Sequence, residues 1–323
     1  MAHDVLTMGR ISVDIYPHDI GVDLEDVTTF GKYLGGSASN VAVAAAKHGL
    51  KSGVITRTGN DPFGTYLHRE LRRYGVDDSQ VSAVDEWPTP VTFCAIKPPE
   101  DFPLYFYRTP TAPDLQIKRA ELDTDAVRSA GIFWMTVTGL CQEPSRDAHA
   151  AALEARPREG LRPGQFTVLD LDYRPMFWPG PDEARTEIAR VLPDVTVAIG
   201  NREECGVAVG EGTPDELADR LLESGVDIAV VKLGSDGVMA ASRSDRVISA
   251  PIPVDPVNGL GAGDAFGGAF CRALTSGWEL RACLDFANAA GAIVAGELSC
   301  SEAMPDTDAV LALLAARGRA VPA

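Results

Sequence analysis

The sequence contains Asn258-Gly259-Leu260-Gly261-Ala262-Gly263-Asp264, and the small residues that follow, 265–270, predict a helix. Glycines at this spacing let backbone N–H groups converge at the start of a helix, where the aligned peptide dipoles favour an anion. A carboxylate beside such a site makes chemical sense if it accepts a proton from a hydroxyl that attacks a phosphoryl group. The segment therefore predicts a phosphoryl-transfer site, and a helix-packing glycine run with an acidic first turn is the alternative.

Other glycine-rich motifs do not account for this segment. A Rossmann fingerprint follows the first strand of its domain, with an acidic residue about 20 positions further on. Here the spacing is G-x-G-x-G and the glycines lie near residue 260. The sequence has no Walker A motif and no G-x-S-x-G motif, which excludes the commonest nucleotide-loop and hydrolase classes.

A second glycine turn lies near the start of the chain. Leu34-Gly35-Gly36-Ser37-Ala38-Ser39-Asn40 precedes an expected helix, Val41–Lys47. Gly35 and Gly36 allow a ligand to approach the backbone, and the amide of Asn40 can both donate to and accept from hydroxyls. This mixture is suited to a polyol.

Strand-like and helical segments alternate along the chain, which has 323 residues, 45% of them hydrophobic. Such alternation is typical of an α/β fold with a parallel sheet covered by helices on both faces. Asp61 and Thr213 are expected helix N-caps. The expected strands are Val5–Met8, Gly53–Arg57, Ile132–Thr136, Phe166–Asp170, Val195–Ile199 and Asp227–Lys232.

Two segments interrupt the alternation. Val91–Lys97 and Leu104–Arg108 have the composition of strands with no helix between them, so they predict a β-hairpin joined by residues 98–103. Residues 12–33 also contain short extended pieces without a helical period. We expect these segments to pair into a small sheet that acts as a lid, and two surface excursions that never meet are the alternative.

Charge and composition exclude several partners. The 29 basic and 46 acidic residues give a net charge of −17, which disfavours nucleic acid and anionic membrane surfaces. No apolar run approaches the roughly 18 residues that span a bilayer, and the first residues lack signal-peptide features, so we expect a cytoplasmic protein. The six cysteines and five histidines show no metal-ligand spacing, and the cysteines are expected to be free thiols.

The two glycine turns together carry a resemblance to a known family. Gly35-Gly36-x-x-x-Asn40, with Gly49 and Gly59, and Gly261-Ala262-Gly263-Asp264 resemble the two signatures of the PfkB, or ribokinase-like, carbohydrate kinases. The resemblance covers nearly the whole chain. It implies a single kinase domain, 1–323, with a three-layer α/β/α core, a mainly parallel sheet and a small β-sheet lid formed by residues of about 12–36 and 89–112.

The resemblance also implies roles for individual residues. Asp264 resembles the catalytic base, and the backbone of Gly261, Ala262 and Gly263 resembles the anion hole of the family. Asp14 resembles the early aspartate that binds sugar hydroxyls, and a plain cap or turn residue is the alternative. The residues implied to bind the sugar are therefore Asp14, Gly35, Gly36 and Asn40.

ATP and Mg²⁺ follow from the same resemblance. Asn201-Arg202-Glu203-Glu204 resembles the N-x-x-E motif, in which Asn201 and Glu204 organise magnesium and phosphate through water. The residues implied to contact the nucleotide are Asn201, Glu204, Lys232, Gly234, Gly237 and Asn288. A plain helix cap for Asn201 and a packed position for Asn288 are the alternatives.

One departure from the family concerns a monovalent cation. The family usually has Asp-Thr where this chain has Asn258-Gly259, in a segment that often contributes to a K⁺ site. Potassium activation is therefore left open, with backbone carbonyls as the remaining ligands. Lid-to-lid dimers are common among relatives, so a homodimer through the lid is a further expectation.

Two arginines predict the class of sugar. Arg108 ends the second strand of the hairpin, and Arg174 follows the strand Phe166–Asp170 at the edge where parallel sheets bind ligands. A guanidinium recognises a carboxylate bidentately, so two of them over one pocket favour a sugar acid. The alternative places Arg108 on the lid surface and Arg174 in an ion pair with Asp170 or Asp172.

Longer segments resemble one subgroup of the family, which phosphorylates the primary C6 hydroxyl of 5-dehydro-2-deoxy-D-gluconate in myo-inositol catabolism. A 2-keto-3-deoxygluconate kinase would share Arg108 and Arg174 and remains an alternative, as does another sugar kinase such as a fructokinase or ribokinase. A nucleoside kinase would have little use for two arginines. A non-catalytic sugar-binding regulator is disfavoured because Asp264 is present. The segments that carry the resemblance are 9–17, 55–64, 98–104, 170–178 and 258–264.

Overall fold

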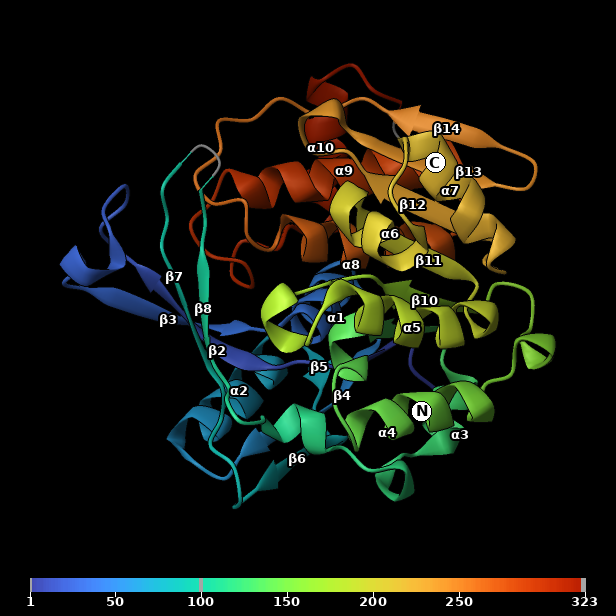
Figure 1. Ribbon diagram of the computed structural model, residues 1–323. Helices are drawn as coiled ribbons and strands as arrows, with labels where there is room; N and C mark the ends of the chain where they lie inside the picture. The colour runs from blue at the N-terminus through green and yellow to red at the C-terminus, as the bar shows by residue number, and fades with distance from the viewer. Residues whose placement is uncertain (1, 99–100, 321–323) are drawn as a thin grey trace.

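The computed structural model describes residues 2–98 and 101–320 and has a large, mainly parallel sheet at its centre (Figure 1). The strand order is β14-β13-β12-β11-β10-β9-β1-β4-β5, and β6 pairs with β4. Pairing is parallel from β5 to β12 and antiparallel for β13 and β14. The strands are β1 (Val5–Met8), β4 (Ser52–Gly59), β5 (Val76–Asp77), β6 (Val81–Val84), β9 (Ile132–Thr136), β10 (Phe166–Asp170), β11 (Val197–Asn201), β12 (Ile228–Lys232), β13 (Val238–Ser242) and β14 (Arg246–Ser249).

Helices cover both faces of this sheet. Successive strand residues point to opposite faces, so Val168 of β10 joins one hydrophobic cluster and Leu169 joins the other. The first cluster packs α1 (Ser37–Lys47), α2 (Pro62–Arg73), α8 (Ala262–Thr275), α9 (Leu280–Ala295) and α10 (Thr307–Ala316). The second packs α3 (Thr124–Ser129), α4 (Ser145–Ala155), α5 (Pro181–Val191), α6 (Arg202–Val209) and α7 (Pro214–Glu223). The predicted three-layer α/β/α fold is confirmed.

Most predicted strands agree with the observed ones, but β11 begins two residues later than expected. Leu192–Asp194 form a 3-10 turn, and the amide of Val195 closes that turn by donating to Leu192 O at 3.3 Å. Val195, the first residue of the predicted strand, therefore belongs to the end of the turn, and the strand itself begins at Val197. The predicted N-caps are confirmed, because Asp61 accepts from the amide of Gly64 and Thr213 forms a capping box.

A four-stranded sheet stands at one side of the core (left in Figure 1). Its order is β3-β2-β7-β8, and Val13 of β2 pairs in parallel with Val91 of β7. The two interrupting segments therefore do meet, as predicted, although Pro99 and Glu100 of the hairpin connection lie outside the described residues. The strands are β2 (Ser12–Pro17), β3 (Phe30–Gly35), β7 (Val91–Cys94) and β8 (Leu104–Tyr107).

The carboxyl ends of the parallel strands meet the start of two helices. Asp170, Asn201 and Lys232 are the last residues of β10, β11 and β12. The beginnings of α1 and α8 lie at the same edge, because Ser37 at the start of α1 donates both to Asp170 at 3.5 Å and to Asp264 in the first turn of α8 at 3.1 Å. Open α/β sheets bind ligands at this edge. Within residues 2–98 and 101–320, no helix has the length and apolarity needed to cross a membrane.

Candidate active site

Asp264 is held by two side chains from α1. Asn40 Nδ2 donates to Asp264 Oδ2 at 2.8 Å, and Ser37 Oγ donates to Oδ1 at 3.1 Å. Helix α1 begins four residues earlier than the predicted Val41, because Gly36 has φ +97° and caps the helix directly before Ser37. Burial raises the pKa of Asp264, and the hydrogen bond from Asn40 opposes that rise. The carboxylate is thus oriented and poised to accept a proton.

The turn before Asp264 requires glycine. Gly261 has φ +81° and caps α8, and a Cβ at this position would lie 2.5 Å from Cys300 Sγ. A Cβ on Gly263 would lie 3.3 Å from Lys232 Nζ, so the ammonium group stands beside the first turn of α8. The free N–H groups of that turn and the ammonium group together form a site for an anion.

Lys232 is surrounded by carboxylates. Its Nζ lies 3.9 Å from Glu204 Oε2. Burial alone would lower the pKa of Lys232, but Glu204, Asp170, Asp264 and other acids raise it above its ordinary value. The side chain therefore stays positively charged at the carboxyl end of β12.

A cavity of about 620 Å³ opens on one side of the turn. It lies between the β12–β13 connection, the segment 251–256 and the helices α8 and α9. Asn288 lies on its wall, and its Nδ2 donates to Ala250 O at 2.8 Å. The predicted nucleotide-contacting residues that line this cavity are Lys232, Gly234, Gly237 and Asn288.

Asn201 and Glu204 form the N-terminal capping box of α6. The amide of Glu204 donates to Asn201 Oδ1 at 2.9 Å, and the amide of Asn201 donates to Glu204 Oε2 at 2.7 Å. In the described part of the chain, no group of three or more His, Cys, Asp or Glu side chains could hold a metal ion. The side-chain oxygens of Asn201 and Glu204 fit a magnesium ion that keeps most of its waters and is bound mainly through the phosphates of the substrate.

A second, smaller cavity of about 50 Å³ lies on the other side of the turn. Asp14 reaches it from β2 and accepts hydrogen bonds from Ser12 Oγ at 2.8 Å and Tyr16 OH at 3.0 Å. Burial raises the pKa of Asp14 to about 6. The absence of a side chain at Gly35 gives this carboxylate its space. The lining residues include Arg10, Asp14, Gly36, Ser37, Asn40, Phe106, Arg174, Gly261, Asp264 and Cys300.

The structure separates the two arginines that were predicted to act together. Arg174 lines the small cavity with Asp264. Arg108 instead donates to the buried carboxylate of Asp114 at 2.7 Å and lies over the ring of Phe177 at 4.9 Å. Arg108 lines a neighbouring cavity of about 650 Å³, which shares Leu104 and Phe106 of β8 with the small cavity.

Arg10 is a site residue that sequence reasoning assigned no role. Arg10 Nη2 donates to Asp172 Oδ2 at 2.9 Å, and Arg174 Nη2 lies 2.8 Å from Asp172 Oδ1. The two arginines lower the pKa of Asp172 against the effect of burial, whereas burial raises the pKa of Asp170 to about 7. The available signal was the position of Arg10, two residues beyond the carboxyl end of β1.

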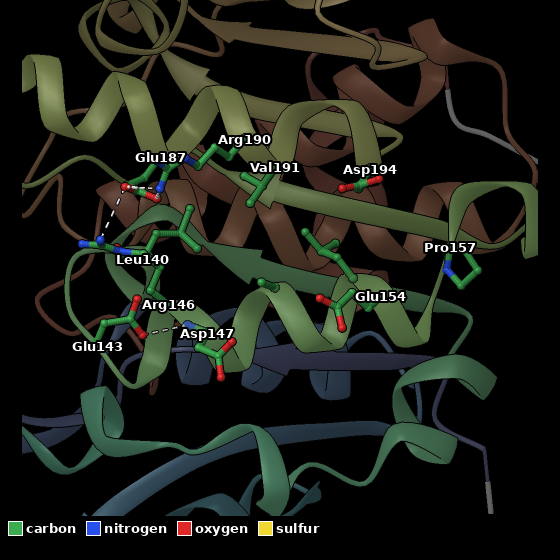
Figure 2. A pocket seen from close by; sticks show the side chains of 12 residues that line it. Leu140, Glu143, Arg146, Asp147, Glu154, Pro157, Glu187, Arg190, Val191 and Asp194 are labelled. Carbon is green, nitrogen blue, oxygen red and sulfur yellow. Dashed lines mark hydrogen bonds and ion pairs between the residues drawn. The ribbon is translucent and has the colours of Figure 1, made fainter.

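A hollow of about 370 Å³ lies between α4 and α5, on the surface shown in Figure 2. Glu187 of α5 accepts from Arg190 at 2.8 Å and from Arg146 of α4 at 3.4 Å. None of the predicted site residues is among the described residues that line it.

Comparison with known proteins shows the family to which the chain belongs. Residues 2–307 match the family described as pfkB family carbohydrate kinase. The chain is 31% identical to the 5-dehydro-2-deoxygluconokinase of Bacillus subtilis strain 168, over 98% of this chain and 97% of that protein. It is 32% identical to the enzyme of the same name from Clostridium perfringens strain 13, over 95% of this chain and 91% of that one.

Solved structures show the same fold. A putative Ribokinase II from E. coli in complex with ATP and Mg²⁺ has a TM-score of 0.87 at 23% identity, covering 98% of this chain and all of that one. A fructokinase from Vibrio cholerae O395 in a form bound to fructose, ADP and calcium has a TM-score of 0.83 at 24% identity, covering 96% and 99% of the two chains.

Proposed function

The chain belongs to the pfkB family of carbohydrate kinases, and we propose that it transfers the γ-phosphoryl group of ATP to the primary C6 hydroxyl of 5-dehydro-2-deoxy-D-gluconate. One observation carries this proposal. The turn from Gly261 to Asp264 forms a wall between two cavities, with Ala262 and Gly263 facing the larger and Gly261 and Asp264 facing the smaller. A nucleotide and an alcohol bound on the two sides would meet at the carboxylate.

The reaction is an in-line displacement in which Asp264 is the base. The C6 hydroxyl donates to Asp264, which takes the proton as the hydroxyl oxygen forms its bond to the γ-phosphorus and the bond to the bridging oxygen breaks, releasing ADP. Backbone N–H groups at the start of α8 and the ammonium of Lys232 stabilise the charge on the transferring group. Positioning and electrostatics supply most of the acceleration, and no covalent enzyme intermediate forms.

Magnesium, when bound with ATP, neutralises charge on the β- and γ-phosphates. Glu204 and Asn201 would hold it through water, with their side chains kept in place by the capping box of α6. A monovalent cation beside the second signature would have to use backbone carbonyls, since the Asn258 side chain accepts from Leu260 N and donates to Leu298 O.

The acceptor side of the proposal rests on charge. Arg174 brings a guanidinium to the small cavity, and a sugar acid gives it a carboxylate to bind. Arg108 would have to leave Asp114 to take part. The curated relatives named above carry the name of a kinase for a substrate of this class.

The small sheet serves as the lid in this proposal. Asp14, Leu104 and Phe106 reach the small cavity from β2 and β8, so the sheet covers the acceptor and excludes water that would otherwise hydrolyse ATP. Tyr105 and Tyr107 on the outer face of β8 are 48% and 68% exposed, which supports a homodimer formed through the lids. Light scattering on the purified protein tests the dimer.

The deciding experiment is an ATP-consumption assay with purified protein and a panel of acceptors: 5-dehydro-2-deoxygluconate, 2-keto-3-deoxygluconate, fructose and ribose. The proposal expects the highest kcat/KM with 5-dehydro-2-deoxygluconate and a phosphate on C6 by NMR. A higher kcat/KM with 2-keto-3-deoxygluconate or a neutral sugar would overturn the substrate, and sugar binding without ATP consumption would favour a regulator.

A further inference from the structure

Two guanidinium groups share one carboxylate at the small cavity. Asp172 contacts Arg10 through Oδ2 at 2.9 Å and Arg174 through Oδ1 at 2.8 Å. Each of its oxygens is therefore occupied by a different arginine. The two guanidinium groups thus share one carboxylate, and Asp14 and Asp264, which line the same cavity, are the other acids that act on Arg10.

Both guanidinium groups line the cavity, but only Arg10 is largely removed from water, because the Arg174 side chain is 34% exposed. Arg10 is only 6% exposed, and its guanidinium lies 5.7 Å from the centre of the Phe106 ring on β8. Within the described ranges, Nε of Arg10 and Nε of Arg174 are both buried without a hydrogen-bond partner. Burial alone would lower the pKa of Arg10, but Asp172 raises it, so the group remains charged.

The other carboxylates of the cavity are already engaged. Asp14 accepts from Ser12 and Tyr16, and Asp264 accepts from Asn40 and Ser37. A buried guanidinium with a free donor is costly unless an acceptor completes its hydrogen bonds. A hydroxyl of a neutral sugar could accept one such hydrogen bond, whereas a carboxylate has two oxygens that can accept from both guanidinium groups at once.

The position of Arg10 is set by its backbone. A Cβ on Gly36 would lie 2.6 Å from Arg10 O, so the start of α1 packs directly on the main chain of Arg10. A Cβ on the preceding Gly9 would lie 2.8 Å from Thr136 Oγ1. Close packing fixes the backbone of Arg10, and the hydrogen bond to Asp172 fixes its guanidinium before a substrate arrives, which reduces the entropy lost on binding.

We propose that Arg10 is a specificity-determining residue, which together with Arg174 binds the carboxylate of the acceptor while Asp172 holds the two guanidinium groups in place. This inference rests on the proposed function, because it concerns the acceptor of the same reaction. It adds a residue from the end of β1 to acceptor recognition and makes Asp172 a positioning residue.

The test compares the acid with its neutral amide, 5-dehydro-2-deoxygluconamide, as acceptors. Wild type is expected to prefer the acid, and Arg10→Gln is expected to reduce that preference roughly 10- to 100-fold, mainly through the KM for the acid. Arg10→Lys keeps the positive charge but cannot donate two parallel hydrogen bonds to a carboxylate. Its preference for the acid over the amide should therefore lie between those of wild type and Arg10→Gln. Arg146→Gln, which removes an arginine from the ion pair in Figure 2, is the matched control and should keep the wild-type preference.

ATP affinity, measured by titration calorimetry, reports folding independently, because Arg10 does not line the larger cavity. An Arg10→Gln protein that binds ATP normally and loses acid and amide activity by the same factor would show a structural ion pair only and overturn the inference. If Arg10→Gln does not fold, an unchanged preference in Arg10→Lys overturns it. A wild type that phosphorylates only neutral sugars would instead overturn the proposed function.

Discussion

The amide of Asn40 donates to the carboxylate of Asp264 across 2.8 Å, which joins the first turns of α1 and α8. The contact connects residues 224 positions apart in the chain. Close packing of the helices brings them together, since a Cβ on Gly268 of α8 would overlap Ala44 of α1. The carboxylate therefore has a fixed direction before either substrate binds.

Replacement of the base is the most direct test of the mechanism. Asp264→Asn keeps the shape of the side chain but cannot accept the proton, so kcat should fall by roughly 10² or more. ATP affinity should change little. Near-normal kcat in a folded Asp264→Asn protein would exclude Asp264 as the base.

Removal of the amide donor should shift the pH dependence. The hydrogen bond from Asn40 lowers the pKa of Asp264, and activity requires the ionised carboxylate. Asn40→Leu should therefore raise that pKa and move the acidic limb of the kcat profile to higher pH. An acidic limb at the wild-type pH would show that this hydrogen bond does not tune the base.

A side chain at Gly261 should damage the anion site. Gly261→Ala forces alanine to φ +81° and brings its Cβ within 2.5 Å of Cys300 Sγ. We expect kcat to fall at least about tenfold, because the N–H groups at the start of α8 are displaced. Cys300→Ala alone is the control. Wild-type kcat in Gly261→Ala would contradict a catalytic role for this turn.

The two predicted arginines should behave differently. Arg174→Ala should remove the preference for a sugar acid, because Arg174 lines the small cavity. Arg108→Ala should lower the free energy of unfolding by about 3–5 kcal/mol, since it leaves the buried carboxylate of Asp114 without its guanidinium. Urea unfolding and acceptor kinetics measure the two effects.

The double variant Arg108→Ala/Asp114→Ala should recover part of that loss, because it removes the unpaired charge as well. A stable Arg108→Ala protein that loses only its preference for the sugar acid would contradict this account. It would support the role in acceptor binding that the sequence predicts for Arg108.

Arg156 is expected to matter for stability and not for chemistry. Its guanidinium is buried and donates to main-chain oxygens that include those of Val127, Ala130 and Gly131. Arg156→Met should lower the free energy of unfolding by more than about 3 kcal/mol, because several buried carbonyls lose their donor. Arg128→Ala, at an exposed ion pair, should change it by less than about 0.5 kcal/mol. Equal effects of the two changes in urea unfolding would contradict this account.

Local pattern was sufficient for the fold, and the glycine turns predicted which residues would lie around Asp264. The alternation of strands and helices, the glycine turn before Asp264 and the N-caps are all encoded over a few residues, and each lies where it was predicted. The hairpin also pairs with residues 12–17 through its first strand, β7. This pairing was predicted because neither segment has a helical period.

Long-range pairing was not accessible in the same way. Arg10 and Asp172 are 162 positions apart, and neither residue indicates the other in a single sequence. The ion pair of Arg108 with Asp114 was not predicted either, for a related reason. Asp114 is only six positions away, but the chain must turn through Pro113–Gln116 to present that carboxylate. Side-chain pairing across a turn is decided by packing, which periodicity does not describe.

The wall from Gly261 to Asp264 also divides the chain into two sets of contacts. Apart from the wall and neighbouring residues 260 and 300, the described lining of the small cavity comes from residues 10–174, whereas the larger cavity is lined by residues 232–295. Under the proposed function, acceptor choice can therefore be redesigned in one half of the chain while the nucleotide site in the other half is left unchanged. The same separation gives natural variants a route to new sugars without loss of ATP use.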